Sequence, residues 1–326
     1  MKVIETSART ATVVGRHQGP VRLGVIGAGV FGGYHSQKFA ASHAAEFVGV
    51  CDLNAEAAAR QVARIGKGAA FHSFEAIAEA SDALVIATPA SSHALLARRA
   101  LEAGLHVLVE KPLALTGVEA RALARLALER DLVLSVGHQE RLVFEAMGLL
   151  ATGERPRRIE AVRMGPASPE GRCEDVSVVF DLMIHDLDLT AELFGGDVRG
   201  VDGSGHSAHT RLLDHASAEL MFAGGGHARL TASRCAPRRE RWMRIEYASG
   251  VVEIDFLTRS VRNTTPFDIR ADVSAILPDP LAAADEAFLA AIQGRAAPVI
   301  TGGVGARAAA MAEIVEACAL QVTVAA

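Results

Sequence analysis

The sequence predicts an α/β protein in which a doubly wound parallel sheet is followed by an α+β domain built on an antiparallel sheet. Two observations lead to this fold class. Residues 21–136 alternate short apolar runs with Ala-rich stretches whose apolar positions recur three and four residues apart, as in a parallel sheet covered on both faces. After residue 140, strand-like runs bounded by Gly, Asn and Asp follow one another with little helix between them. At 326 residues the chain can form two cores, so we expect an extension over 1–20 and domains over 21–140 and 141–326.

Five strands joined by helices are expected in the first domain. The strands are VRLGVIG, EFVGVCD, ALVIATP, HVLVEKP and LVLSVGH, and the clearest helices are NAEAAARQVARIG, SSHALLARRALEAG and TGVEARALARLALERD. Right-handed crossovers place the carboxyl ends of such strands on one edge, where open α/β sheets bind their ligands.

The second domain is expected to begin with a helix over 141–150, the strand RRIEAVRMG and an apolar helix over 180–193. The strands ASAELMF, GHARLTASR, RWMRIEYAS, GVVEIDF and RSVRN then form an antiparallel sheet. Two helices, LAAADEAFLAAIQ and VGARAAAMAEIVEACAL, follow these strands, and we expect the last helix to pack back on the first domain.

Composition excludes several classes of protein. Half of the residues are apolar and 22% are charged, as in ordinary soluble proteins, and the net charge of −5 argues against a nucleic-acid binder. No apolar run reaches the ~18 residues that a membrane span needs. The four cysteines lack CxxC spacing, and residues 1–20 lack the apolar core of a secretory signal, although their composition also suits a transit peptide. We therefore expect a cytoplasmic protein with free thiols.

A glycine-rich turn follows the first strand directly. In GAGVFGG, Gly27, Gly29 and Gly32 match GxGxxG, with Val30 and Phe31 completing the loop. The first glycine permits the tight turn, the second lets the backbone approach a pyrophosphate, and the third lets the helix pack close to the strand. The amino terminus of that helix also attracts an anion. This context predicts a dinucleotide site on a Rossmann domain, against the alternative of a glycine turn without a ligand.

An acidic residue closes the second strand. Asp52 lies 25 residues beyond Gly27, close to the usual spacing for the acid that accepts hydrogen bonds from the adenosine ribose. A carboxylate there repels a 2′-phosphate. The sequence therefore favours NAD over NADP, and the alternative is an Asp that only caps the next helix.

The apolar run HVLV ends abruptly at Glu110, Lys111 and Pro112. Polar residues and proline commonly end a strand without any further role. Alternatively, Lys111 projects from the carboxyl end of a parallel strand into a ligand crevice. The apolar run and its polar end do not decide between these two interpretations.

A second polar group lies in VVFDLMIHDLDL. Asp181 and His185 are four residues apart and share one face of a helix, with Asp188 three residues further along. A neutral imidazole can take up a hydroxyl proton near neutral pH, which makes His185 a candidate base, although a histidine in an apolar helix is commonly a core residue. A metal bound by these three residues is less favoured, because no supporting ligands appear elsewhere.

The stretch VIATPASSHALLARRALEAGLHVLVEKPLALT, Val85 to Thr116, resembles the signature region of the Gfo/Idh/MocA oxidoreductases, named for glucose–fructose oxidoreductase and inositol dehydrogenase. The resemblance covers nearly the whole chain after residue 20. It implies a Rossmann domain followed by an α+β domain with a large open antiparallel sheet, through which members commonly form dimers or tetramers.

The resemblance also implies roles for residues near the cofactor. Thr88 and Pro89 are expected to border the nicotinamide, with His93 grouped among the cofactor-binding residues. Glu110 and Lys111 are expected beside the reacting carbon, where Lys111 bonds the substrate hydroxyl or the nicotinamide ribose.

A DxxxH pair of the family is matched by Asp181 and His185. His185 is then the base, with Lys111 and Asp181 positioning and polarising the hydroxyl, and the Lys111–Pro112 peptide bond is expected to be cis. Oxidation by such a base is expected to strengthen as the pH rises through a histidine-like value of roughly 6.5.

Three further segments, DVSVVFD, VGHQER and LTASR, resemble a subgroup that acts on nucleotide-linked acetamido sugars such as UDP-N-acetylglucosamine, at C3. The subgroup usually continues the second segment as RFNP, whereas this chain has RLVFEA, so substrate contacts are not carried over from that segment. His138, at the end of the last parallel strand, is a candidate for the substrate pocket. The candidate cations for the pyrophosphate are Arg141, Arg163, Arg172 and Arg234.

The sequence therefore predicts an NAD-dependent dehydrogenase that acts on a CH–OH group of a sugar or nucleotide sugar. It is expected to be a homodimer or homotetramer, with no metal, nucleic acid or membrane partner. Two alternatives remain: a dehydrogenase or reductase of a free sugar, inositol or other polyol, and a non-catalytic dinucleotide sensor.

Overall fold

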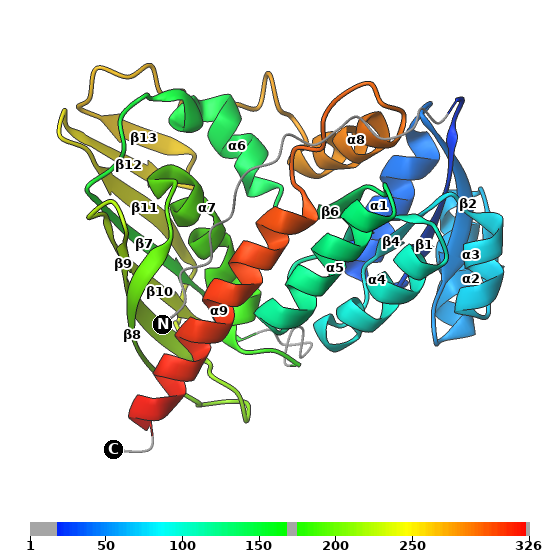
Figure 1. Ribbon diagram of the computed structural model, residues 1–326, viewed down its shortest axis with the longest axis horizontal. Helices are drawn as coiled ribbons and strands as arrows, with labels where there is room; N and C mark the ends of the chain where they lie inside the picture. Colours follow the sequence, from blue (N-terminus) through cyan, green and yellow to red (C-terminus); the bar gives the residue numbers. More distant parts are fainter. Residues whose placement is uncertain (1–17, 168–174, 324–326) are drawn as a thin grey trace.

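The computed structural model describes residues 18–167 and 175–323 (Figure 1). Most of the predicted extension over 1–20, and Arg172, lie outside these ranges. Figure 1 shows the two sheets at opposite ends of the molecule, with α5, α7 and α9 between them. Among the described residues, no helix combines the length and the apolar character needed to cross a bilayer.

The first sheet has six parallel strands in the order β3-β2-β1-β4-β5-β6. Its strands are β1 (Val21–Ile26), β2 (Ala45–Cys51), β3 (Ala69–Phe71), β4 (Ala83–Ile86), β5 (His106–Val109) and β6 (Leu134–Val136). The sequence predicted all of these except β3, which has three residues, none of them fully buried, and so lacks an apolar signal. The strand order reverses between β1 and β4, which is where open sheets of this kind form a ligand crevice.

Helices cover both faces of this sheet because its central strands are apolar throughout. All four residues of β4 are buried. The helices are α1 (Val30–Ala41), α2 (Ala55–Ile65), α3 (Phe74–Ala80), the 3₁₀ turn η1 (Ala90–Ser92), α4 (His93–Glu102) and α5 (Gly117–Glu129). Asn54, Ser73 and Thr116 cap α2, α3 and α5 by accepting a bond from an amide of the first turn.

Seven strands form the second sheet, in the order β13-β12-β11-β7-β10-β9-β8. They are β7 (Arg158–Met164), β8 (Val198–His206), β9 (His215–Phe222), β10 (His227–Ser233), β11 (Glu240–Glu246), β12 (Val251–Asp255) and β13 (Ser260–Asn263). Adjacent strands pair antiparallel except β7 and β10, which are parallel, so the sheet is mixed where the sequence predicted a purely antiparallel one. The prediction also missed β8, whose three glycines weaken the strand pattern.

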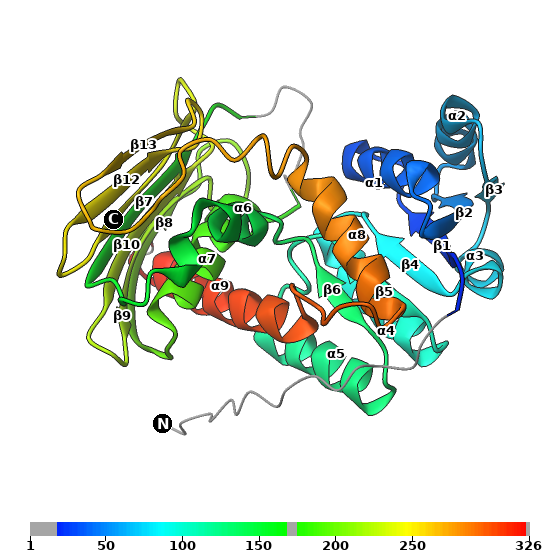
Figure 2. The ribbon, with the colours of Figure 1, turned by 90° about the horizontal axis from the view of Figure 1, so that it is seen from above.

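The remaining helices connect the two sheets. They are α6 (Glu140–Met147), the 3₁₀ turn η2 (Leu149–Ala151), the π turn η3 (Val179–Met183), α7 (Ile184–Phe194), α8 (Pro280–Ile292) and α9 (Gly302–Thr323). Helices α7 and α9 cover one face of the second sheet, and α9 also packs along α5. Helix α8 lies beside α1 of the first sheet (Figure 2). A domain division near residue 140 stays a prediction, but the last segment of the chain clearly contacts both sheets.

Candidate active site

The glycine loop at the end of β1 has the geometry of a phosphate cradle. Gly27 has φ +109°, and a Cβ there would collide with the carbonyl of Ala87. A Cβ on Gly32 would collide with the carbonyl of Gly27, whereas a Cβ on Gly29 would meet no atom of the described chain within 4 Å. Gly27 and Gly32 are therefore required by packing, while Gly29 borders open space that a pyrophosphate can fill.

Helix α1 begins directly behind this loop. Gly29 is its N-cap residue and brings no capping side chain, and Val30 in the first turn remains 44% exposed. Phe31 packs edge-on against Tyr34, with ring centroids 6.0 Å apart. A helix amino terminus capped only by glycine presents its amides to an anion, so the loop and α1 fit a dinucleotide phosphate.

Asp52 holds the same loop from the end of β2. Its Oδ2 accepts a hydrogen bond from the amide of Ala28 at 2.6 Å, and its Oδ1 accepts one from the amide of Asn54 at 2.8 Å. The carboxylate therefore lies beside the glycine turn, where it can reach a ribose bound next to the pyrophosphate. The predicted contact with the ribose stays a proposal.

Lys111 reaches from the end of β5 to the π turn before α7. Its Nζ donates to the main-chain oxygen of Asp181 at 2.6 Å and to the carboxylate of Asp181 at 3.1 Å. The predicted cis Lys111–Pro112 bond is present. The side chain of Lys111 thus contacts the segment before α7, and its predicted role in a ligand crevice stays a proposal.

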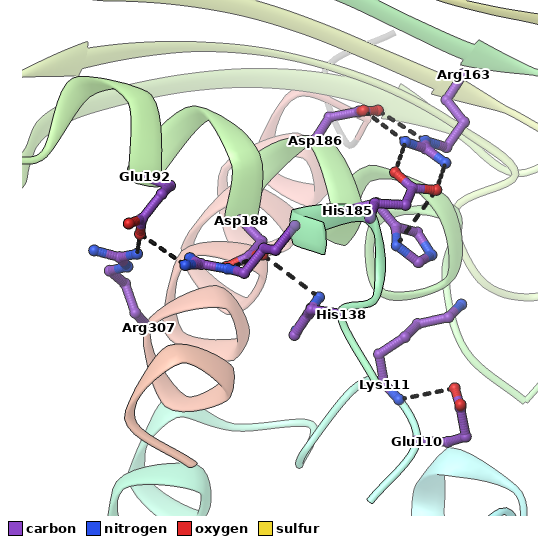
Figure 3. A network of polar contacts seen from close by, with 11 residues as sticks. Glu110, Lys111, His138, Arg163, His185, Asp186, Asp188, Glu192 and Arg307 are labelled. Carbon is purple, nitrogen blue, oxygen red and sulfur yellow. Dashed lines mark hydrogen bonds and ion pairs between the residues drawn. The ribbon is translucent and has the colours of Figure 1, made fainter. Parts of the chain in front are cut away.

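His185 lies in the first turn of α7, close to Lys111 (Figure 3). The side chain is 12% exposed, and its buried Nδ1 has no hydrogen-bond partner among the described residues. Burial, aided by the positive charges of Arg163 and Lys111, lowers the pKa of His185 well below its ordinary value of 6.5. The imidazole is therefore neutral near physiological pH and able to accept a proton.

His138 follows β6 and is almost completely buried. Neither of its ring nitrogens has a hydrogen-bond partner in the described part of the chain, and the ring faces His185 edge-on with centroids 6.3 Å apart. Burial lowers the pKa of His138, so this imidazole too is neutral. The carboxylate of Asp188 lies 3.9 Å from Nδ1 of His138. Buried polar atoms without hydrogen bonds are costly, so the imidazoles of His138 and His185 indicate a place where a ligand supplies the missing bonds.

Thr88, Pro89 and His93 follow the end of β4. The hydroxyls of Thr88 and Ser92 share a hydrogen bond of 2.7 Å. The ring of His93 is buried, with Nδ1 2.7 Å from the carbonyl oxygen of Pro112 and Nε2 2.9 Å from that of Thr88. This arrangement argues against the predicted contact between His93 and the cofactor, because its ring holds the β4 and β5 loops together. Thr88 and Pro89 remain candidates at the crevice.

The surroundings of Arg141 argue against its predicted pyrophosphate-binding role. Its guanidinium is buried and donates to both carboxylate oxygens of Asp188 at 2.7 Å and to Glu192 at 2.8 Å. A buried guanidinium requires such partners, and their negative charge cancels the attraction that a phosphate would feel.

Arg163 and Arg234 are engaged in the same way. Arg163 donates to Asp186 at 2.8 and 3.0 Å and to Glu140 at 2.7 and 2.9 Å. Arg234 donates to the carbonyl of Val176 at 2.7 Å and lies 3.5 Å from the carboxylate of Asp214. These contacts argue against a pyrophosphate role for either residue, because the carbonyl and carboxylate groups already occupy the guanidinium groups. The sequence could not show which carboxylates approach each arginine.

A buried chain of three residues, Glu110, His35 and Asp285, was not anticipated. Nε2 of His35 lies 3.0 Å from Oε1 of Glu110, and Nδ1 lies 2.8 Å from Oδ1 of Asp285. Burial alone would lower the pKa of His35, but Asp285 and Glu110 outweigh it and raise the pKa to about 10. The same charged imidazole holds the pKa of Glu110 below its usual value, against the effect of burial. This chain ties α8, α1 and the end of β5 together.

The chain matches two family models. Residues 21–138 match the model described as "Oxidoreductase family, NAD-binding Rossmann fold", and residues 155–253 match the "GFO/IDH/MocA C-terminal domain". The UDP-N-acetylglucosamine 3-dehydrogenase of Acidithiobacillus ferrooxidans is 40% identical over 315 residues, which cover 94% of this chain and 97% of that protein. The scyllo-inositol 2-dehydrogenase (NAD(+)) of Bacillus subtilis is 30% identical over 67% of this chain and 68% of that enzyme.

Solved structures share the fold. The structure of the Acidithiobacillus ferrooxidans enzyme superposes with a TM-score of 0.82 at 38% identity, covering 92% of this chain and 97% of that one. The WlbA dehydrogenase of Bordetella pertussis, in complex with NADH and UDP-GlcNAcA, has a TM-score of 0.84 at 20% identity, over 94% of this chain and 97% of that one, and shows the shared fold alone. The predicted fold class and family are confirmed: the chain belongs to the Gfo/Idh/MocA family of oxidoreductases and is an NAD-binding dehydrogenase.

Proposed function

We propose that this dehydrogenase oxidises the C3 hydroxyl of a nucleotide-linked acetamido sugar, UDP-N-acetylglucosamine, with NAD as the oxidant. The observation that carries the proposal is that Lys111, just after β5 of the first sheet, lies near His185 of α7, a helix that packs on the second sheet (Figure 3). Support for the sugar comes from the 40% identity to the UDP-N-acetylglucosamine 3-dehydrogenase over nearly the full length of both chains.

The residues divide the proton chemistry between them. His185 accepts the hydroxyl proton, because its lowered pKa keeps the imidazole neutral. The ammonium of Lys111 stabilises the negative charge that develops on the sugar oxygen, and Asp181 holds that ammonium in place at 3.1 Å. When bound at the glycine loop, NAD supplies the acceptor for the hydride.

The same site needs groups that orient the sugar. The two nitrogens of His138 have no hydrogen bond within the described chain, although Nδ1 lies 3.9 Å from Asp188, and they can bond a neighbouring hydroxyl or the acetamido group, which would hold C3 against the nicotinamide. Asp52, Thr88 and Pro89 are proposed to contact the cofactor, Asp52 at the adenosine ribose and the other two near the nicotinamide.

The substrate assignment is tested by measuring NADH formation with UDP-N-acetylglucosamine, free N-acetylglucosamine and inositol. Burial of the nucleotide against the protein is expected to raise kcat/KM for the UDP-sugar at least ~100-fold over the free sugar, which corresponds to about 2.8 kcal/mol. Faster oxidation of inositol than of the UDP-sugar would favour the activity named for the Bacillus subtilis relative. Tight NADH binding without turnover on any of the three would indicate a dinucleotide sensor.

We also propose that the enzyme is a cytoplasmic homodimer or homotetramer. One face of the second sheet is covered by α7 and α9, and the outward face carries the side chains of alternate strand residues such as Trp242 and Met221. Light scattering coupled to gel filtration measures the assembly, and a mass of one chain at micromolar concentration would contradict it.

A further inference from the structure

The carboxylate of Glu140 faces the buried Nδ1 of His185. Oε1 of Glu140, at the start of α6, lies 3.9 Å from Nδ1 of His185, in the first turn of α7. That Nδ1 has no hydrogen-bond partner among the described residues. The distance is within the range of an ion pair but longer than a hydrogen bond, so a small movement of the imidazole would complete the contact.

Glu140 is itself held rigidly. Arg163 donates to its two oxygens at 2.9 and 2.7 Å, and Arg241 lies 3.6 Å from Oε1. Burial alone would raise the pKa of Glu140, but Arg163 outweighs it and holds the pKa far below its usual range. Glu140 is therefore a fixed negative charge whose plane is set by a guanidinium fork.

We propose that Glu140 is the positioning residue of His185: it keeps the proton of the neutral imidazole on Nδ1 and leaves Nε2 to take up the substrate proton. An ionised carboxylate only accepts hydrogen bonds, so it favours the tautomer that carries hydrogen on the facing nitrogen. The inference rests on the proposed function, since it takes His185 as the base.

The proton and the hydride leave the substrate separately. The hydroxyl proton passes to Nε2 of His185, the hydride passes from the carbinol carbon to the nicotinamide, and the alcohol becomes a ketone. His185 then carries a positive charge in a pocket where Lys111, Arg163 and His138 all disfavour it. Glu140 opposes these groups from 3.9 Å, so it stabilises the imidazolium that the reaction forms.

The structure offers a matched control for this charge. Asp186 is bound by the opposite edge of the same guanidinium, with bonds of 3.0 and 2.8 Å from Arg163. Its side chain is 5% exposed, against 24% for Glu140, and among the described residues its hydrogen bonds are with Arg163 and not with His185. Asp186→Asn thus removes one negative charge from the same cluster without touching the imidazole.

The first experiment compares the pH dependence of kcat/KM in Glu140→Gln, Glu140→Asp and Asp186→Asn. Glu140→Gln is expected to move the acidic limb to lower pH and to reduce the plateau rate at least about tenfold, with KM for NAD unchanged. Glu140→Asp, which keeps the charge, should recover part of the rate. Asp186→Asn should leave the acidic limb of the kcat/KM profile at the same pH as in the unsubstituted enzyme. Equal shifts in Glu140→Gln and Asp186→Asn would overturn the proposal in favour of a purely structural charge cluster.

The second experiment needs neither substrate nor a stable Glu140 variant. Nitrogen NMR of the imidazoles in the NAD-bound enzyme, with the His185 signal identified by its loss in His185→Asn, is expected to show hydrogen on Nδ1. A signal from the Nε2–H tautomer would overturn the proposal. If UDP-N-acetylglucosamine is not oxidised at all, the proposed function fails while this measurement still decides the role of Glu140.

Discussion

The ammonium of Lys111 is fixed by the main-chain oxygen and the carboxylate of Asp181, at 2.6 and 3.1 Å, across 70 residues of sequence. Lys111 follows the carboxyl end of β5 in the parallel sheet, and Asp181 lies in the π turn that precedes α7. Because the two groups come from segments that fold against different sheets, the site exists only when both sheets are assembled.

Replacement of Lys111 by alanine should stop turnover without loss of the cofactor. Its charge stabilises the sugar oxygen only during reaction, so we expect kcat to fall by at least ~10²–10³-fold while the Kd for NADH changes little. Steady-state kinetics and NADH fluorescence titration measure the two effects. Lys38→Ala is the control, because Lys38 is also ion-paired, with Asp279, but lies in the last turn of α1, at the other end of the helix from the glycine loop. Near-normal turnover in Lys111→Ala would contradict a catalytic role for this lysine.

Two glycines of the phosphate loop should respond differently to the same added methyl group. A Cβ on Gly29 meets open space at a φ of −75°, so Gly29→Ala should keep its thermal stability and lose at least ~10-fold in affinity for NADH. A Cβ on Gly32 collides with the Gly27 carbonyl, so Gly32→Ala should be destabilised by about 1–3 kcal/mol as well. Thermal melts and NADH titration separate the two. Normal NADH binding by Gly29→Ala would show that the pyrophosphate does not cross this loop.

Asp52 should determine the choice between NAD and NADP. The variant Asp52→Asn keeps an oxygen for the amide of Ala28 and removes the charge that repels a 2′-phosphate. We expect the ratio of kcat/KM for NAD over NADP to fall at least ~10-fold, or about 1.4 kcal/mol. An unchanged ratio would mean that a group other than Asp52 distinguishes the ribose of NAD from the 2′-phosphate of NADP.

The elements that were predicted correctly carry local signals. Gly27, Gly29 and Gly32 mark a turn within six residues, and Glu110 and Lys111 mark the end of a strand whose neighbours are apolar. A resemblance in sequence then added the pairing of these residues with Asp181 and His185, which spacing alone left undecided.

The elements that were missed depend on partners distant in sequence. His35 gives no signal in its own segment, because Glu110 and Asp285 lie 75 and 250 residues away. The ion pairs of Arg141 and Arg163 could not be predicted for the same reason: only the folded chain shows the carboxylates that approach them. The parallel pairing of β7 with β10 likewise depends on the path of the chain between them and not on the strand patterns.

His35 should make stability depend on pH in the alkaline range. Its pKa is raised from 6.5 to about 10 in the folded protein, so its contribution is complete below about 6.5 and is lost as the pH rises through about 10. We expect the melting temperature to fall over that window, and His35→Asn to lower stability by about 3–5 kcal/mol because Glu110 and Asp285 lose their shared partner. Thermal melts across the pH range measure both. The exposed His43 provides the control His43→Asn, and an unaltered pH slope in His35→Asn would contradict the assignment.

The pH dependence of oxidation should follow the lowered pKa of His185. The sequence led us to expect a rise near 6.5, but burial, Arg163, Lys111 and His138 lower the pKa well below that value despite the opposing charge of Glu140. A base acts in its neutral form, which is present above its pKa, so kcat/KM should be flat above about 6.5 and should decline only as the pH falls through the lowered value. His185→Asn should lose this acidic limb together with at least ~10²-fold in kcat. A limb centred at or above 6.5 in the unsubstituted enzyme, or one retained in His185→Asn, would assign the proton to a different group.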